Sequence, residues 1–304
     1  MIDYKKVIKN EKTRYLILNL LGFIPDKQMI KIQYWIKTGR KLCLDKPERY
    51  SEKIQWYKLN SRNDLMQKCS DKYSVREYVK SKGLSDILNE SYGVFNSVDE
   101  IEWDKLPSSF VFKDTLGAGG RSMVFVFDKE NIDRNKINKT LRSWVNINPK
   151  RKSYGREWIY EGRRHRIIAD RILAGDKDGD LPDYKFFCFY GKVFCLYMTR
   201  NYTMHHELGE LGFLDRDFNL LPVHRGETYL PMNEQPEKPK NFDRMIEMAE
   251  VLSEGFPHVR VDFYNIDGKI VFGEMTFFTA SGYILFKPDS FDYEMGKMFT
   301  LPQI

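Results

Sequence analysis

The chain has 304 residues, with 49 basic and 43 acidic side chains and therefore a net charge of +6. Its length is enough to bury a core in one large domain or two. The modest positive charge favours anionic small molecules or a membrane surface as partners over nucleic acid. Its 4 cysteines lack metal-ligand spacing and are typical of reduced core thiols, which predicts a cytoplasmic protein.

Residues 1–65 are predicted to form a helical segment rich in lysine. Its apolar run, 15–24, is interrupted by Asn19 and closed by Pro25, and it is shorter than the ~20 residues that a membrane span needs. Two interpretations stay open for this segment: packing against the body of the protein, or peripheral contact with the inner face of a membrane. The second rests on the basic residues before the run, which are Lys5, Lys6, Lys9, Lys12 and Arg14.

A second helix is expected from residue 70 or 71 to about Lys82, with Gly83 placed to end it. Two runs of apolar residues then flank a glycine cluster, which predicts a hairpin over 110–128. Glycine lets backbone N–H groups approach anionic oxygens, and Lys113 adds a positive charge beside them. A polyphosphate ligand and an ordinary glycine turn are both compatible with this pattern.

The order of residues in this hairpin excludes two familiar nucleotide sites. A Walker loop ends in Gly-Lys-Ser/Thr, whereas Gly120 is followed by Arg121 and Ser122. In protein kinases the phosphate lysine follows the glycine loop, whereas Lys113 precedes it. A lysine followed by a glycine loop between two strands is the order found in ATP-grasp enzymes.

The middle of the chain alternates loops and strands. Residues 148–171 are polar and basic, which indicates a solvated loop or a holder of phosphate or carboxylate, and 167–173 is expected to form a strand. The Asp-rich stretch 176–180 is expected to be a turn. A hairpin is predicted over 185–198. A helix is predicted later in the chain, with Asn241 as its N-cap and with methionines that face the core.

The C-terminal stretch 258–276 predicts two strands around a turn. A three-residue loop over 266–268 would put Arg260 opposite Glu274, whereas a two-residue loop would separate Asp262 from Glu274. With the longer loop, four polar side chains face the same way: Arg260, Asp262, Glu274 and Thr276. Such a group could bind Mg²⁺ and phosphate, or it could be an ordinary surface ion pair.

Several segments in the same order resemble one family: 51–56, 71–79, 110–120, 183–189 and 259–277. From about residue 40 onward the chain resembles the TupA-like ATP-grasp proteins of teichuronopeptide biosynthesis. The resemblance implies an α+β protein with the ATP-grasp fold, in which two α+β subdomains close over ATP and Mg²⁺. It places the catalytic domain at 66–304, after the helical N-terminal segment 1–65.

The resemblance also implies a role for particular residues. Arg260 and Lys113 would stabilise phosphoryl transfer, and a hydroxyl at Thr276 stands where most ATP-grasp enzymes have Asn. The hinge that reads adenine would lie at 169–173, where Asp170-Arg171 replaces the usual acidic pair. The implied nucleotide-binding residues are Lys72, Lys113, Gly117, Gly119, Gly120, Asp170, Ile172, Asp183 and Lys185, and the implied metal ligands are Asp262, Glu274 and Thr276.

The resulting hypothesis is an ATP-dependent carboxylate–amine ligase that works through an acylphosphate. The family context implies a uronic-acid carboxylate of a bacterial surface polysaccharide or its precursor as acceptor, and an amino acid as amine. A sugar kinase, a glycosyltransferase and a non-catalytic scaffold are the alternatives. The arginines considered for the anionic acceptor are Arg163, Arg164, Arg166, Arg200 and Arg225.

Overall fold

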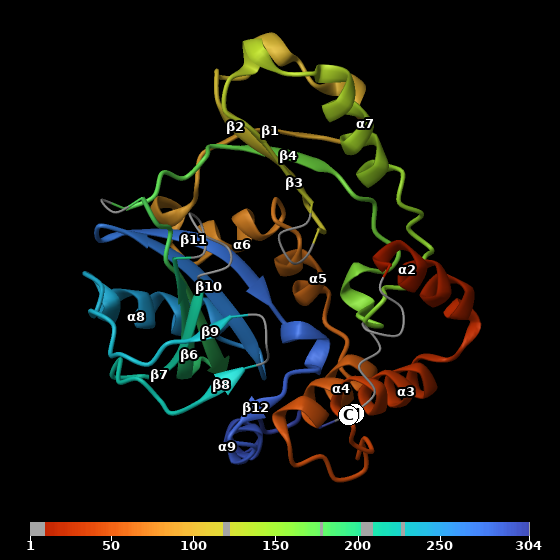
Figure 1. Cartoon of the computed structure of the whole chain (residues 1–304), viewed down its shortest axis with the longest axis vertical. Helices are drawn as coiled ribbons and strands as arrows, with labels where there is room; N and C mark the ends of the chain where they lie inside the picture. Colours follow the sequence, from red (N-terminus) through yellow and green to blue (C-terminus); the bar gives the residue numbers. More distant parts are fainter. Residues whose placement is uncertain (1–9, 118–121, 177–178, 202–208, 226–228, 304) are drawn as a thin grey trace.

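The computed structural model describes residues 10–117, 122–176, 179–201, 209–225 and 229–303 (Figure 1). Several sequence predictions therefore lie outside the described residues: those for Lys5, Lys6 and Lys9, for Gly119 and Gly120, and for part of the 176–180 turn. The described helices are α2 (Glu11–Leu20), α3 (Asp26–Thr38), α4 (Tyr50–Asn60), α5 (Asp64–Ser70), α6 (Val75–Ser81), α7 (Arg134–Val145), α8 (Phe242–Ser253) and α9 (Ser290–Met298).

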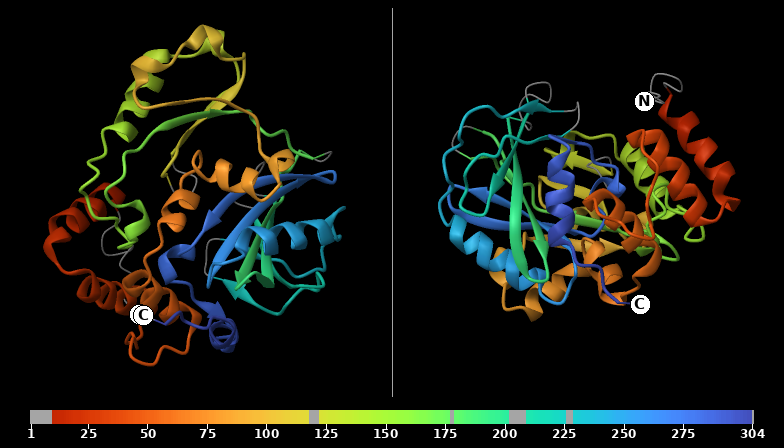
Figure 2. Two further views of the ribbon diagram at one scale, coloured as in Figure 1. Left: turned by 180° about the vertical axis from the view of Figure 1, so that it is seen from behind. Right: turned by 90° about the horizontal axis from the view of Figure 1, so that it is seen from below.

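Two main sheets organise the molecule. The small antiparallel sheet has the order β1-β4-β2-β3, and the large sheet has the order β11-β10-β5-β6-β7-β9. Figures 1 and 2 show the small sheet, flanked by α7, above the part of the large sheet formed by β10 and β11. The strands are β1 (Ser91–Phe95), β2 (Phe110–Asp114), β3 (Met123–Val126), β4 (Ile167–Asp170), β5 (Asp183–Phe189), β6 (Lys192–Arg200), β7 (Glu210–Asp215), β8 (His224–Arg225), β9 (Leu230–Pro231), β10 (Val259–Ile266), β11 (Lys269–Thr276) and β12 (Phe286–Lys287).

The two faces of the large sheet differ in chemistry because successive side chains on a strand point to opposite faces. One face is apolar and packs against α8, with Phe186 of β5 and Phe263 of β10 in contact across neighbouring strands. The other face carries the polar residues of β5 and β10, among them Lys185 and Asp262, which pair directly. This polar face is the foundation of the candidate site.

The small sheet has the same division into an apolar face and a functional face. Phe110 and Phe112 of β2 pack in a separate core with Leu141 and Trp144 of α7. Lys113 directly follows Phe112 in the strand and therefore projects from the opposite face. The predicted hairpin is confirmed, with Phe110 paired to Val126 at its open end.

The N-terminal segment contacts the rest of the protein in two places. Tyr50, Ile54 and Tyr57 of α4 are fully buried in the main core. Nearer the N-terminus, the buried guanidinium of Arg156 donates to the main-chain oxygens of Leu21 and Ile24 and to other groups of the same turn. The boundary at residue 65 stays a prediction, and α4 shares its core with the later elements. In the described ranges, no helix has both the length and the apolar composition needed to span a bilayer.

Two boundaries predicted from the sequence were wrong. The helix expected from residue 70 or 71 begins at Val75, because the Asp71 carboxylate accepts from the N–H groups of Tyr73 and Ser74 in a turn before it. The strand expected over 167–173 ends at Asp170. The chain forms a turn at the first place and is irregular at the second, instead of continuing a regular element.

The predicted cap of α8 was also wrong. The helix is confirmed, but the Asn241 side chain does not cap it. Asn241 has a positive φ of 63°, and its amide donates to the main-chain oxygen of Gly268 at 2.7 Å. The residue therefore ties the start of α8 to the β10–β11 turn.

A buried histidine connects α4 to the large sheet. His258 is fully buried, with Nε2 2.9 Å from the Tyr50 hydroxyl and Nδ1 3.0 Å from the main-chain oxygen of Cys188. Burial outweighs these bonds and lowers the pKa of His258 from 6.5 to about 3. The imidazole is therefore neutral in the folded protein at physiological pH.

This burial predicts a specific acid sensitivity. Below pH 6.5 an unfolded chain protonates His258 while the folded chain does not, so stability is lost as the pH falls toward about 3. Between about pH 7.5 and pH 5 we expect this residue to lower the free energy of unfolding by about 2 kcal/mol. Urea unfolding at both pH values checks this. The His258→Gln variant should lack that part of the pH dependence, and an unchanged pH dependence would contradict the assignment.

Candidate active site

The polar residues of β10 and β11 share one face for a different reason from the one expected. The turn contains two residues, Asp267 and Gly268, so the shorter of the two loops considered is present, and the expectation that it would separate Asp262 from Glu274 was wrong. A β-bulge at Gly273 inserts one extra residue into β11, which restores the pairing of Asp262 with Glu274. Arg260 pairs with Thr276 in the same register. The predicted shared face is therefore present, and the bulge produces it.

Gly273 is held tightly inside this bulge. A Cβ atom added there would lie 3.0 Å from the main-chain oxygen of Asp262. We expect Gly273→Val to lower the free energy of unfolding by about 1–3 kcal/mol and to displace Glu274 from Asp262. Urea unfolding and an ADP-release assay measure the two effects. A variant with wild-type stability and turnover would show that the bulge does not set the spacing of the carboxylates.

The Arg260 guanidinium bridges the two carboxylates. It donates to Asp262 through Nε at 2.7 Å and Nη2 at 2.6 Å. Nη2 also lies 3.0 Å from Glu274 Oε1 and 3.0 Å from the Thr276 hydroxyl, which in turn donates to Glu274. Arg260 and Asp262 are buried, whereas the Glu274 side chain is 42% exposed. One cation thus compensates two neighbouring acids at the edge of the solvent.

Lys185 extends this network across β5. Its Nζ lies 2.6 Å from Asp262 Oδ2 and forms an ion pair with Asp183 on its own strand. Burial and the charge of Asp262 raise the pKa of Asp183 to about 6, against the lowering effect of Lys185. The buried Oδ1 of Asp183 has no hydrogen-bond partner among the described residues. The predicted residues Asp183 and Lys185 are therefore part of the same polar face.

Lys72 connects the glycine hairpin to this network. Its Nζ donates to the main-chain oxygen of Gly117, and its backbone N–H donates to Thr115 at 2.9 Å. Burial raises the pKa of Glu274, but the charges of Lys72, Arg260 and Lys185 outweigh burial and lower it to about 2. Lys72 is thus close enough to act on Glu274 while it holds the start of the glycine segment.

The remaining predicted nucleotide residues lie on the small sheet. Lys113 Nζ forms a 3.0 Å ion pair with Asp170 Oδ2, which joins β2 to β4. Ile172 follows the end of β4, in a segment whose neighbour Arg171 donates its N–H to the main-chain oxygen of Glu90. The predicted phosphate lysines thus come from two strands, Lys113 of β2 and Lys185 of β5, and from the turn before α6.

Sequence reasoning missed Asp71, which organises the turn that carries Lys72. Its carboxylate is buried and pairs with Arg166 at 3.0 Å and with Arg163 at 3.4 Å. Burial raises the pKa of Asp71, but its N–H donors and the two arginines lower it overall. An Asp placed four residues before the first residue of a helix was the available signal.

Tyr197 of β6 is the second residue that sequence reasoning missed. Its hydroxyl accepts from Arg260 Nη1 at 3.4 Å, and the Arg225 guanidinium lies 5.3 Å from its ring centroid. The predicted 185–198 hairpin is confirmed and pairs Tyr197 with Lys185, so its alternation could have revealed this residue. Tyr197 therefore links Arg225 to the arginine at the centre of the site.

Comparisons with known proteins identify the family. Residues 52–300 match the family described as TupA-like ATPgrasp. The chain belongs to the TupA-like ATP-grasp family. The predicted ATP-grasp fold, with its two sheets in an α+β protein, is therefore confirmed. The expectation of an ATP-grasp enzyme is confirmed at the level of the family.

Solved structures similar to this TupA-like chain include three ligases. An L-amino acid ligase from Bacillus licheniformis is 17% identical, with 71% of this chain and 42% of that one covered and a TM-score of 0.39. D-Alanine–D-alanine ligases from Bacillus anthracis and Helicobacter pylori are 14% and 17% identical, both with TM-scores of 0.44. The alignments cover 82% and 77% of this chain and 68% and 61% of those ligases. The chain thus spans between 42% and 68% of these three proteins. No curated protein matches it.

The donor set of the TupA-like chain fits a magnesium ion. Mg²⁺ is held in proteins by one or two carboxylates, with substrate phosphates and water as its other ligands. Asp262 and Glu274 provide such a pair on adjacent strands, and the guanidinium nitrogen between them marks a place where the fold accepts positive charge. The described residues contain no group of three or more His, Cys, Asp or Glu placed to hold a metal. The third position at Thr276 stays a prediction.

Proposed function

We propose that the protein is an ATP- and Mg²⁺-dependent carboxylate–amine ligase. One observation carries this proposal: Lys72 contacts the start of the glycine segment and acts electrostatically on Glu274. The phosphate-binding features of the hairpin and the paired carboxylates therefore belong to one site. That combination is suited to a nucleotide triphosphate whose charge is balanced by lysines and a divalent ion.

The proposed reaction has two steps. An oxygen of the acceptor carboxylate attacks the terminal phosphorus of ATP, and ADP leaves, which forms an acylphosphate. An amine then attacks the acyl carbon, loses a proton and displaces phosphate, which forms the amide. Magnesium would neutralise phosphate charge between Asp262 and Glu274, while Lys72, Lys113 and Arg260 would hold the oxygens around the reacting phosphorus.

The ion pairs favour one of the five arginines as the holder of the acceptor carboxylate. Arg163 and Arg166 pair with Asp71, and Arg200 pairs with Glu210. Neither Arg164 nor Arg225 has an ion-pair partner among the described residues, but Arg164 is exposed in the basic segment, whereas Arg225 stacks on Tyr197 beside Arg260. We therefore assign the acceptor carboxylate to Arg225.

This assignment predicts a separation of kinetic constants. Arg225→Gln should raise the KM for the carboxylate substrate by roughly 10- to 100-fold, because a charge-assisted contact is lost, with a smaller change in the KM for ATP. Steady-state ADP release with each substrate varied in turn measures both. Arg164→Gln, on an exposed arginine of the basic segment, is the matched control. A rise confined to the KM for ATP would contradict the assignment.

We further propose a uronic acid of a bacterial surface polysaccharide, or its precursor, as the carboxylate and an amino acid as the amine. The support is family membership and a site with arginine beside the reaction centre. The test is ADP release with Mg²⁺ and ATP across combinations of nucleotide-linked uronic acids and amino acids, followed by mass spectrometry. ADP release that requires both partners, with a product mass equal to their sum minus water, is the expected result.

Two other outcomes would point to different functions. ADP release with the sugar alone and a mass gain of one phosphate would make the protein a sugar kinase. Consumption of a nucleotide sugar without ATP would make it a glycosyltransferase. Either outcome would refute the ligase.

A further inference from the structure

Exposed apolar side chains recur on the first two described helices and on the turn after α2. Leu16, Leu20 and Phe23 are 59%, 68% and 82% exposed and follow each other at helical spacing, so they form one stripe along α2 and the turn after it. Ile32 and Trp35 are exposed in the same way on α3. We call these five residues the apolar stripe.

The apolar stripe differs from the scattered apolar residues of an ordinary protein surface. Single exposed apolar residues need no explanation, but a concentration of them marks an interaction site. Of the fourteen large apolar side chains that are exposed in the described ranges, five lie between residues 16 and 35. The intervening surface of α3 carries the exposed lysines Lys27 and Lys31, which flank the apolar side chains.

A basic cavity adjoins the same helix. It has a volume of about 350 Å³ and is lined by Leu18, Asn19 and Gly22 together with residues 150–154 and Arg156. Four of its lining residues are cations: Lys150, Arg151, Lys152 and Arg156. Asp26 pairs with both Lys152 and Arg156, at 2.6 and 3.0 Å. The cavity therefore keeps an excess of positive charge.

We propose that the apolar stripe and this cavity form a docking surface for a membrane that contains anionic phospholipid. A peripheral helix binds such a membrane through apolar side chains that enter the acyl boundary and cations that meet the headgroups. The stripe supplies the first contact and the cavity, which fits a phosphate group, supplies the second. Charge complementarity with the anionic leaflet selects this occupant over an uncharged apolar partner.

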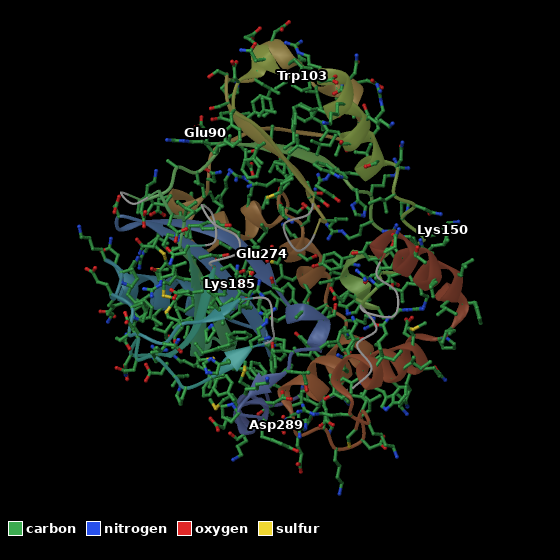
Figure 3. All side chains as sticks on the ribbon, in the orientation of Figure 1. Glu90, Trp103, Lys150, Lys185, Glu274 and Asp289 are labelled. Carbon is green, nitrogen blue, oxygen red and sulfur yellow. The ribbon has the colours of Figure 1, made fainter. Side chains whose placement is uncertain are left out.

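The docking surface is separate from the candidate active site. Figure 3 shows Lys150 at the margin of the molecule near α2, apart from Lys185 and Glu274. The proposal therefore does not depend on the ligase reaction. Its failure would leave the proposed function untouched, and the reverse also holds.

The test is co-sedimentation of the full chain with vesicles. Phosphatidylcholine vesicles that contain phosphatidylglycerol should bind the protein, whereas phosphatidylcholine alone should bind it far more weakly, and added salt should weaken the binding. The double substitution Leu20→Glu and Phe23→Glu should lower the vesicle partition coefficient by at least about tenfold. Val251→Glu, on an exposed apolar residue of α8, is the matched control and should bind as the wild type does.

A second double substitution tests the contribution of the cavity to membrane binding. Lys150→Glu with Arg151→Glu should also lower the partition coefficient by at least about tenfold, since two cations become two anions. The control is Lys136→Glu with Lys139→Glu on exposed positions of α7. Circular dichroism and nucleotide binding show whether each variant is folded.

Several results would overturn the proposal. They are the absence of binding to anionic vesicles, equal binding to neutral vesicles, binding that survives both variants, and equal loss in the controls. A concentration-dependent dimer that the Leu20→Glu and Phe23→Glu variant abolishes, without vesicle binding, would instead make the stripe a contact between copies of the chain. That result would also overturn the proposal.

Discussion

Replacement of Glu274 by glutamine is expected to reduce turnover by at least about 100-fold while the protein stays folded. The pKa of Glu274, lowered to about 2, keeps the carboxylate ionised at every working pH. Glutamine has the same shape, and its amide oxygen can still accept from Arg260 and Thr276. Only the negative charge that would hold the metal is lost. ADP release measures turnover, and urea unfolding checks the fold.

The control for this experiment is Glu254→Gln. Glu254 is also a carboxylate with a cation partner, since it lies 2.7 Å from Lys82, but it belongs to the turn after α8. This variant should keep wild-type turnover. A folded Glu274→Gln variant with full activity would refute the metal-binding role of the residue.

Removal of the arginine between the carboxylates should have the largest effect on stability. Arg260→Met leaves Asp262 buried with Lys185 as its remaining cation, and we expect the free energy of unfolding to fall by about 3 kcal/mol. Magnesium should recover more stability in this variant than in the wild type, because Arg260 no longer competes for the carboxylates. Urea unfolding with and without MgCl₂ measures both effects.

Arg200→Met provides the comparison for a less buried pair. Arg200 and Glu210 are each partly exposed, so loss of their ion pair should cost less than about 1 kcal/mol. Magnesium should stabilise this variant only as much as it stabilises the wild type. If magnesium stabilised neither the wild type nor Arg260→Met, the carboxylates would not be a metal site.

Patterns that are local in the sequence predicted the main features of the site well. The β2–β3 and β5–β6 hairpins follow from alternating apolar residues and glycine turns, and both are confirmed. Gly117 marks the start of the glycine segment that Lys72 contacts. The combination of lysine, glycine segment and paired carboxylates could thus be found before any coordinates.

Features that depend on tertiary contacts were not predictable. The sequence did not decide between the two-residue and three-residue turns, because the shorter turn requires Asp267 to adopt a positive φ of 52°, which few residues other than glycine do. The bulge at Gly273 could not be inferred from the sequence, because a glycine within a strand can mark a bulge, a tight bend or a close backbone approach. It is recognised only from the pairing of β10 with β11. The ion pairs of Asp71 join it to a segment about ninety residues later in the chain.

The central claim is that one site binds ATP through the lysines and holds magnesium between Asp262 and Glu274. A crystal structure of the protein with ADP and Mg²⁺ tests it most directly. The account predicts diphosphate beside Lys72 and Lys113, a metal ion in contact with both carboxylates, and Arg260 released from Glu274. A nucleotide bound elsewhere, or an Arg260 that still bridges the two carboxylates with no ion between them, would contradict it.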